Sequence, residues 1–148
     1  MQSSEAMTIR YCSLGLGILF LLLGIAGFIP NLTTGPLSAF PGPGYGYVLG
    51  LFPTNYFHNA IGILVGLWGI AGFTSLGGAI AFNQAFAIIY AIQAIFGLFP
   101  FTKTLFGIMP LFGNNIWLSL LTAAIAYYFG FVKPGLLTKE TGFSANLR

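Results

Sequence analysis

The stretch GLFPTNYFHNAIGILVGLWGIAGF, residues 50–73, determines how the rest of the chain is interpreted. It begins with polar side chains, among them the only histidine, His58, and continues as an apolar segment interrupted by regularly spaced glycines. An apolar segment of about 17–25 residues is long enough to cross the hydrocarbon core of a bilayer. The stretch therefore predicts a transmembrane helix over about residues 55–73.

The composition indicates that the whole chain, and not only this stretch, lies in a membrane. Of its 148 residues, 57% are hydrophobic and only 5% are charged, whereas a soluble domain carries about 25% charged residues. We therefore expect one transmembrane domain over residues 1–148, with lipid around most of its surface. The five Lys and Arg residues do not cluster, so nucleic acid is not an expected partner.

Three other apolar segments have a similar length, and they predict helices over about residues 9–29, 77–99 and 114–132. Polar tails over 1–8 and 133–148 complete the chain. A cleaved signal peptide is the alternative for the first segment, but its apolar core would be about 7–15 residues long, and this run is longer. The expected fold is all-α, an integral membrane four-helix bundle.

The connections between these helices are also apolar. Residues 31–52 contain PGPGYGY at 41–47, and residues 100–113 contain one charge, Lys103. Proline and glycine exclude a regular helix there. Because aromatic rings favour the membrane–water interface, we expect these connections to lie along it.

The few charges predict a membrane orientation. Four spans place both chain ends on one side, with Arg10, Lys133, Lys139 and Arg148, whereas Lys103 lies on the other side. Lys and Arg are enriched in cytoplasmic segments. We therefore expect both termini to be cytoplasmic.

The sequence contains two internal similarities. The pattern GILxxxxGIAGF occurs at residues 17–28 and at 62–73. In addition, GFIP at 27–30 resembles GLFP at 97–100, and LFxxN recurs at 51–55 and 111–115. Two interpretations remain open: two parallel helical hairpin repeats related by an axis along the membrane normal, or chance similarity between glycine-rich apolar segments.

Helical spacing predicts which faces pack inside the bundle. At 3.6 residues per turn, the second helix presents one stripe of small residues together with its histidine. Glycine lets two helix backbones approach closely in lipid, so this stripe is the predicted helix-packing face. The stripes are His58, Gly62, Gly66, Gly69 and Gly72 in the second helix, Asn83, Ala87, Tyr90, Ala94 and Gly97 in the third, and Ser119, Ala123, Ala126 and Gly130 in the fourth.

The side chains needed for common hydrolytic chemistry are missing. The chain has one His, one Cys and no Asp, and its only carboxylate side chains are Glu5 and Glu140 in the tails. These groups cannot build a hydrolytic zinc site or a Ser-His-Asp triad. We therefore expect neither an enzyme nor a metal site.

Neutral polar side chains gather at one predicted end of the bundle: His58, Asn59, Gln93 and Asn115. One interpretation is helix capping and hydrogen bonding between helices. The other is a cofactor-binding site, in which neutral imidazole ligates a metal or the magnesium of a pigment, or hydrogen-bonds a quinone carbonyl.

Three segments carry a resemblance to a known family: residues 17–34 (GILFLLLGIAGFIPNLTT), residues 49–72 (LGLFPTNYFHNAIGILVGLWGIAG) and Asn114-Asn115. They resemble a bacterial four-helix membrane family catalogued as domain of unknown function 4383, over about residues 10–132. The resemblance implies a multi-pass protein of the bacterial cell membrane, or of the thylakoid in a cyanobacterium. Family members often carry a histidine where this chain has Gly62 or Leu118, and an acidic residue where it has Asn114, which argues against a metal held by paired histidines.

These observations lead to one functional expectation with two alternatives. We expect a non-catalytic accessory or scaffold subunit that packs with membrane lipids, with other integral membrane proteins or with a second copy of itself. The first alternative is a binder of a hydrophobic cofactor, a pigment or quinone, near His58. The second is a transporter or channel component, which is disfavoured because no Asp, Glu, Lys or Arg lies on the predicted interior faces and 148 residues leave little room for alternating access.

Overall fold

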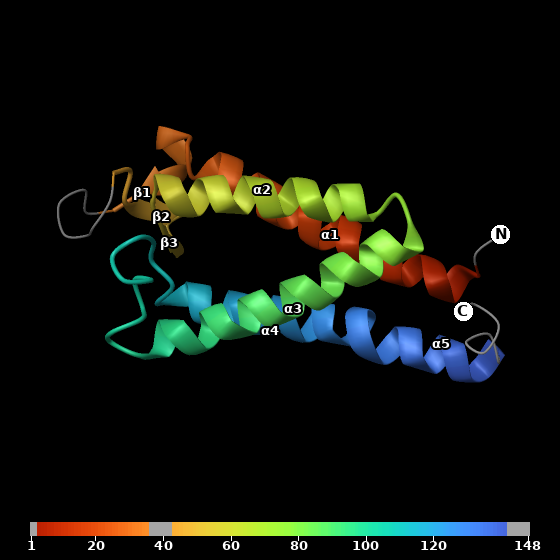
Figure 1. The fold of residues 1–148 in the computed structure, drawn as a ribbon. Coiled ribbons are helices and arrows are strands. Elements are labelled where there is room, and N and C mark those ends of the chain that lie inside the picture. The colour runs from red at the N-terminus through yellow and green to blue at the C-terminus, as the bar shows by residue number, and fades with distance from the viewer. Residues whose placement is uncertain (1–2, 36–42, 142–148) are drawn as a thin grey trace.

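The computed structural model describes residues 3–35 and 43–141 of the chain, which form two helical hairpins stacked on each other (Figure 1). The four main helices are α1 (Ser4–Ala26), α2 (Tyr56–Gly72), α3 (Leu76–Leu98) and α4 (Asn114–Tyr127). A π-helical turn, Tyr128–Val132, follows α4 and leads directly into α5 (Lys133–Thr141).

Three of these helical stretches are long and apolar enough to cross a membrane: Ser4–Ala26, Leu76–Leu98 and Asn114–Lys139. The fourth, α2, has 17 residues and is therefore about 25 Å long at 1.5 Å per residue. That length lies at the lower limit for a bilayer core of about 30 Å. The described chain is thus mainly helical, with three helices of clear membrane-crossing length rather than the four that we expected.

The first helix begins earlier, and the last helical stretch ends later, than the sequence predicted. Helix α1 begins at Ser4, inside the predicted polar tail, because the Ser3 hydroxyl accepts the Ala6 N–H at 3.1 Å and caps the helix. At the other end of the chain, the predicted stop at Lys133 is wrong, since α5 continues to Thr141. Pro134 has no N–H to donate to the Gly130 carbonyl one turn earlier, but this carbonyl instead accepts Nε2 of Gln84 at 3.0 Å, so the helical stretch continues. The last predicted tail residues, 142–148, lie outside the described residues.

The connection between α1 and α2 contains a small antiparallel sheet, which the all-α expectation did not include. After a 3-10 turn at Pro30–Leu32, its strands are β1 (Thr33–Thr34), β2 (Gly46–Val48) and β3 (Phe52–Thr54), in the order β1-β2-β3. Thr33 pairs with Val48, and Tyr47 pairs with Pro53. Strands of two or three residues are too short to produce a readable alternation of polar and apolar side chains.

The hairpins place all connections at two ends. The described parts of the connections, residues 27–35, 43–55 and 99–113, form one end, which we call the loop end (Figure 1). The start of α1, the α2–α3 turn and α5 form the other, which we call the terminal end. Three cations of the described residues lie at the terminal end: Arg10, Lys133 and Lys139. The Nε atom of Arg10 donates to the Phe73 carbonyl at 2.7 Å, and Lys133 pairs with Glu5. Lys103 belongs to the loop end.

The first hairpin is closed by the glycine stripe of α2. Gly62, Gly66, Gly69 and Gly72 are all buried. A Cβ atom on Gly66 would lie 2.5 Å from the Leu21 nitrogen and 2.7 Å from the Gly17 carbonyl oxygen. The backbones of α1 and α2 therefore touch directly, an approach that only glycine permits.

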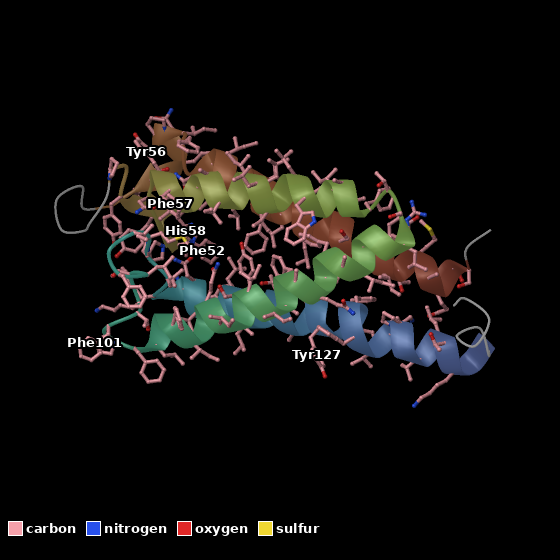
Figure 2. The ribbon with its side chains drawn as sticks, viewed as in Figure 1. Phe52, Tyr56, Phe57, His58, Phe101 and Tyr127 are labelled. Atoms are coloured by element: carbon pink, nitrogen blue, oxygen red, sulfur yellow. The ribbon has the colours of Figure 1, made fainter. Side chains whose placement is uncertain are left out.

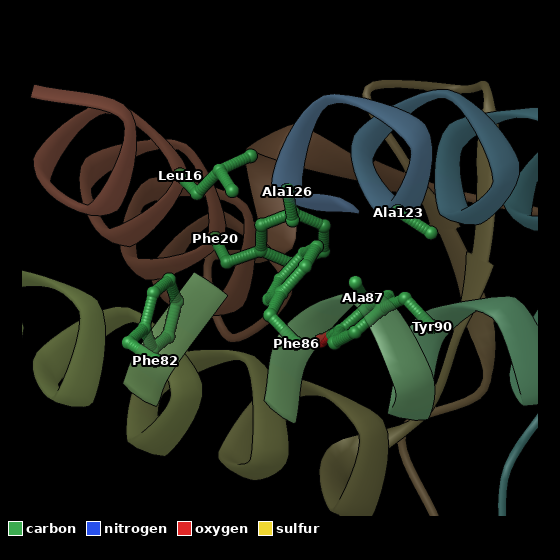
Figure 3. Close-up of a cluster of buried hydrophobic side chains, with 8 residues drawn as sticks. All are labelled: Leu16, Phe20, Phe82, Phe86, Ala87, Tyr90, Ala123 and Ala126. Atoms are coloured by element: carbon green, nitrogen blue, oxygen red, sulfur yellow. The ribbon is translucent and has the colours of Figure 1, made fainter. Parts of the chain in front are cut away.

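Aromatic side chains fill the space where the two hairpins meet (Figure 3). The rings of Phe86 and Tyr90 are stacked with their centroids 4.0 Å apart, and Phe20 meets both edge-on at 5.2 and 4.9 Å. Offset and edge-to-face ring pairs of this kind add about 0.5–1.5 kcal/mol each to the burial of their surfaces. The core is thus an aromatic contact between α1 and α3.

The two hairpins bury equivalent positions. Seven positions of α1 and its exit are buried together with their partners 70 residues later: Ile9 and Ala79, Ser13 and Asn83, Leu16 and Phe86, Gly17 and Ala87, Phe20 and Tyr90, Gly24 and Ala94, Gly27 and Gly97. Four positions around α2 correspond to α4 with a shift of 60: Asn55 and Asn115, Asn59 and Ser119, Gly62 and Thr122, Gly66 and Ala126. These shifts are those of the GFIP/GLFP and LFxxN similarities.

Candidate polar site at the loop end

Asparagine side chains tie the two loop-end connections to each other. Asn55, the N-cap of α2, donates through Nδ2 to the Ile108 carbonyl of the second connection at 2.8 Å. Asn115, in the first turn of α4, donates back to the Pro53 carbonyl of the first connection at 2.7 Å and to the Pro110 carbonyl at 3.2 Å. Each hairpin thus satisfies a carbonyl group of the other. This shared role accounts for the asparagine that ends both LFxxN patterns, Asn55 and Asn115.

His58 belongs to a compact polar group at the start of α2. The Thr54 hydroxyl donates to Oδ1 of Asn59, and its oxygen lies 3.3 Å from Nδ1 of His58. The hydroxyl has a single proton, so when Thr54 donates it to Asn59, Nδ1 of His58 is the donor toward Thr54. In that arrangement the imidazole is the Nδ1–H tautomer and Nε2 is an acceptor.

The four predicted site residues line one cavity between the hairpins. His58 and Asn59 come from α2, Gln93 from α3 and Asn115 from α4. Figure 2 shows His58 at the loop end, on the side of α2 that faces the second hairpin, near Phe52. Thr54 and Ser119, which were not among the predicted site residues, also line this cavity. Ser119 lies on the predicted interior stripe of the fourth helix, whereas no sequence pattern distinguishes Thr54 from other hydroxyl side chains.

The size of the cavity limits what it can hold. Its volume is about 40 Å³. One water molecule needs about 10–15 Å³ measured in this way, whereas a cavity that binds benzene measures about 150 Å³. The cavity as described therefore has room for a few water molecules, and a pigment or quinone ring would have to widen it.

Three further polar side chains inside the bundle donate to backbone carbonyls of neighbouring helices. Ser13 of α1 donates to the Gly69 carbonyl at 2.6 Å, and Gln84 of α3 donates to the Gly130 carbonyl at 3.0 Å. Asn83 donates to the Ile9 carbonyl at 3.2 Å. Within the described residues, no three His, Cys, Asp or Glu side chains come together as a metal site would require.

The fold and this site define a class: a small, mainly helical protein of two apolar hairpins that polar side chains join at the loop end. The chain belongs to the family described as domain of unknown function 4383, whose model matches residues 10–132. No curated protein and no solved structure shows significant similarity to it.

Proposed function

We propose that the protein is a non-catalytic subunit of a membrane assembly, embedded in the bilayer through its helices. Large apolar side chains are exposed along every main helix, including Leu22 of α1, Leu64 of α2, Ile95 of α3 and Leu120 of α4, each more than half exposed. Water would penalise such a surface, whereas lipid tails and partner helices would not. This exposed apolar surface supports the membrane location.

The polar side chains support a structural role. Within the described hairpins, Asn55, Asn115, Ser13 and Gln84 donate to backbone carbonyls of another segment. Hydrogen bonds between membrane helices contribute about 0.6–2 kcal/mol each. Ser13 and Gln84 join the helices within one hairpin, and Asn55 and Asn115 join the two hairpins to each other. Side chains used in this way are not directed toward a substrate.

The observation that carries the subunit role is an open groove between α3 and α4. Its volume is about 400 Å³, and its lining is apolar: Ala87, Ile88, Ala91, Leu120, Ala123, Ala124, Tyr127 and Phe131. Four alanines give the groove a shallow floor, and larger side chains form its rim. Because membrane helices associate through small residues that allow close approach, we infer that the groove receives a transmembrane helix of another membrane protein.

The proposal also covers the membrane in which the protein lies, the side of that membrane on which its termini lie, and the origin of its two hairpins. The terminal end carries Arg10 and Lys133, and the loop end carries Lys103. By the positive-inside rule, both termini lie in the cytoplasm of a bacterial cell, or on the equivalent side of a thylakoid. The equivalent buried positions of the two hairpins support their origin as a duplicated helical hairpin.

The subunit role is tested by extracting the protein from its native membrane in mild detergent and measuring the mass of the intact complex. We expect a complex with a fixed stoichiometry that contains a second integral membrane protein. Ala91→Trp, which fills the groove, should reduce recovery of the partner at least tenfold, whereas Leu64→Trp on α2 should not. A protein that migrates alone at every detergent concentration would contradict the proposal.

A second candidate function is binding of a hydrophobic cofactor near His58. The observation that favours it is the convergence of His58, Asn59, Gln93 and Asn115 on one cavity. A pigment would be detected in the absorption spectrum of the purified protein, and a quinone in its organic extract. Either signal should disappear in His58→Ala. A colourless protein with no extractable quinone would exclude this candidate.

A further inference from the structure

The cavity at the loop end contains one polar group that the fold leaves unsatisfied. The Asn59 side chain is 1% exposed, and its Nδ2 atom has no hydrogen-bond partner among the described residues. A buried donor without a partner costs about 1–3 kcal/mol. Such a group in a native structure therefore requires an explanation, of which a bound water molecule is the most frequent.

Most of the cavity wall is apolar, but polar side chains reach it from α2, α3 and α4. Gln93, Ser119, Tyr90 and His58 line the same space as Asn59. A water molecule can accept a hydrogen bond from the Asn59 amide and donate one to Nε2 of His58. Internal water makes about three hydrogen bonds in polar cavities, whereas apolar cavities stay dry.

The charge and volume of the cavity as described favour small neutral occupants. An ion needs a counter-charge when it is buried, and every cavity-lining side chain is neutral when His58 is in its neutral form. The volume of about 40 Å³ corresponds to about three water molecules. We propose that this cavity is a binding site for a small cluster of ordered water, which joins α2 to α3 and α4 through Asn59, His58, Gln93 and Ser119.

The proposal does not depend on the subunit role, because it concerns only the interior of the protein. The experiment is water-selective NMR on isotope-labelled protein in deuterated detergent, at mildly acidic pH where amide exchange is slow. Direct cross peaks to water are expected at the side-chain amide of Asn59. Asn55 provides the matched control, since it is also 1% exposed but lies outside the cavity, and its side chain donates to the Ile108 carbonyl and accepts the His58 N–H.

Two variants test whether the water signal of Asn59 arises from this cavity. Gln93→Leu removes a polar wall, and Ser119→Val removes another and narrows the space. Each should weaken the water cross peak of Asn59 at least twofold. The proposal is overturned if Asn59 shows no water contact, if Asn55 shows an equal one, or if both variants leave the signal unchanged. It is also overturned if added bromide shifts the Asn59 resonance, because the cavity would then be an anion site.

Discussion

Replacing Gly66 with alanine tests the closeness of the α1–α2 contact. The added Cβ would lie 2.5 Å from the Leu21 nitrogen and 2.7 Å from the Gly17 carbonyl oxygen, whereas normal contacts of a Cβ atom are essentially never shorter than 3.0 Å. Both opposing atoms belong to the backbone of α1, so rotation of a side chain cannot relieve the clash. The two helices must separate by several tenths of an ångström, which opens the packing on both sides of the substitution.

Gly15→Ala is the matched control, because a Cβ on Gly15 meets nothing within 4 Å. Both substitutions gain the same intrinsic helix propensity, about 1 kcal/mol, and this gain cancels when the two variants are compared. The difference is the cost of overpacking, about 1–3 kcal/mol. Gly66→Ala should therefore be less stable than Gly15→Ala by that amount.

The measurement is unfolding in mixed micelles with increasing SDS, followed by tryptophan fluorescence. Trp68 is a suitable reporter because it lies in α2, with its ring edge-on to Phe82 at 5.2 Å. We expect Gly66→Ala to unfold at a lower SDS fraction than the wild type, and Gly15→Ala at an equal or higher one. Equal midpoints for the two variants would refute the direct backbone contact.

Three other substitutions test the polar contacts by the same assay. Asn115→Leu leaves two buried carbonyls without a donor and should destabilise the protein by about 1–3 kcal/mol. Asn114→Leu loses two exposed hydrogen bonds, one to the Leu51 carbonyl and one from Trp117, and should cost less, about 0.5 kcal/mol; equal losses would contradict the reciprocal contact between the two connections. Ser13→Ala should cost about 0.6–1.7 kcal/mol, because its hydroxyl donates to the Gly69 carbonyl inside the bundle; an unchanged midpoint would count against that bond. Glu5→Gln should change stability by at most about 1 kcal/mol, since its pair with Lys133 is exposed on the Glu5 side, and a larger loss would show that the pair holds the termini.

The helices were predictable because their signal is long and local. Apolar runs located α1, α2 and α3 to within a few residues, and the helical period of 3.6 grouped Gly62, Gly66 and Gly69 on one buried face. Helix caps such as Asn55 could be identified because their side chain bonds a backbone group three residues away. These features depend on neighbouring residues, so one sequence contains enough information to predict them.

The sequence did not reveal features that depend on contacts between distant segments. The sheet pairs Thr33 with Val48, and strands this short have too few residues for the pairing to be predicted from the sequence. Pro134 normally ends a helix, but the preceding π-helical turn allows a new helical segment to begin there. The cavity brings Thr54 and Ser119 together from different hairpins. For the site, the sequence therefore supplied the residue types that line the cavity, while its size and its unsatisfied amide required the packed structure.

The central claim, that the groove between α3 and α4 receives a helix of another membrane protein, is tested most directly by photocrosslinking in native membranes. A photoreactive amino acid at Ala91 lies in the groove, and the same residue at Leu64 lies on the exposed face of α2. We predict one discrete, heavier product from Ala91 that contains the same integral membrane protein in every preparation, and no such product from Leu64. Lipid adducts alone at both positions would contradict the claim.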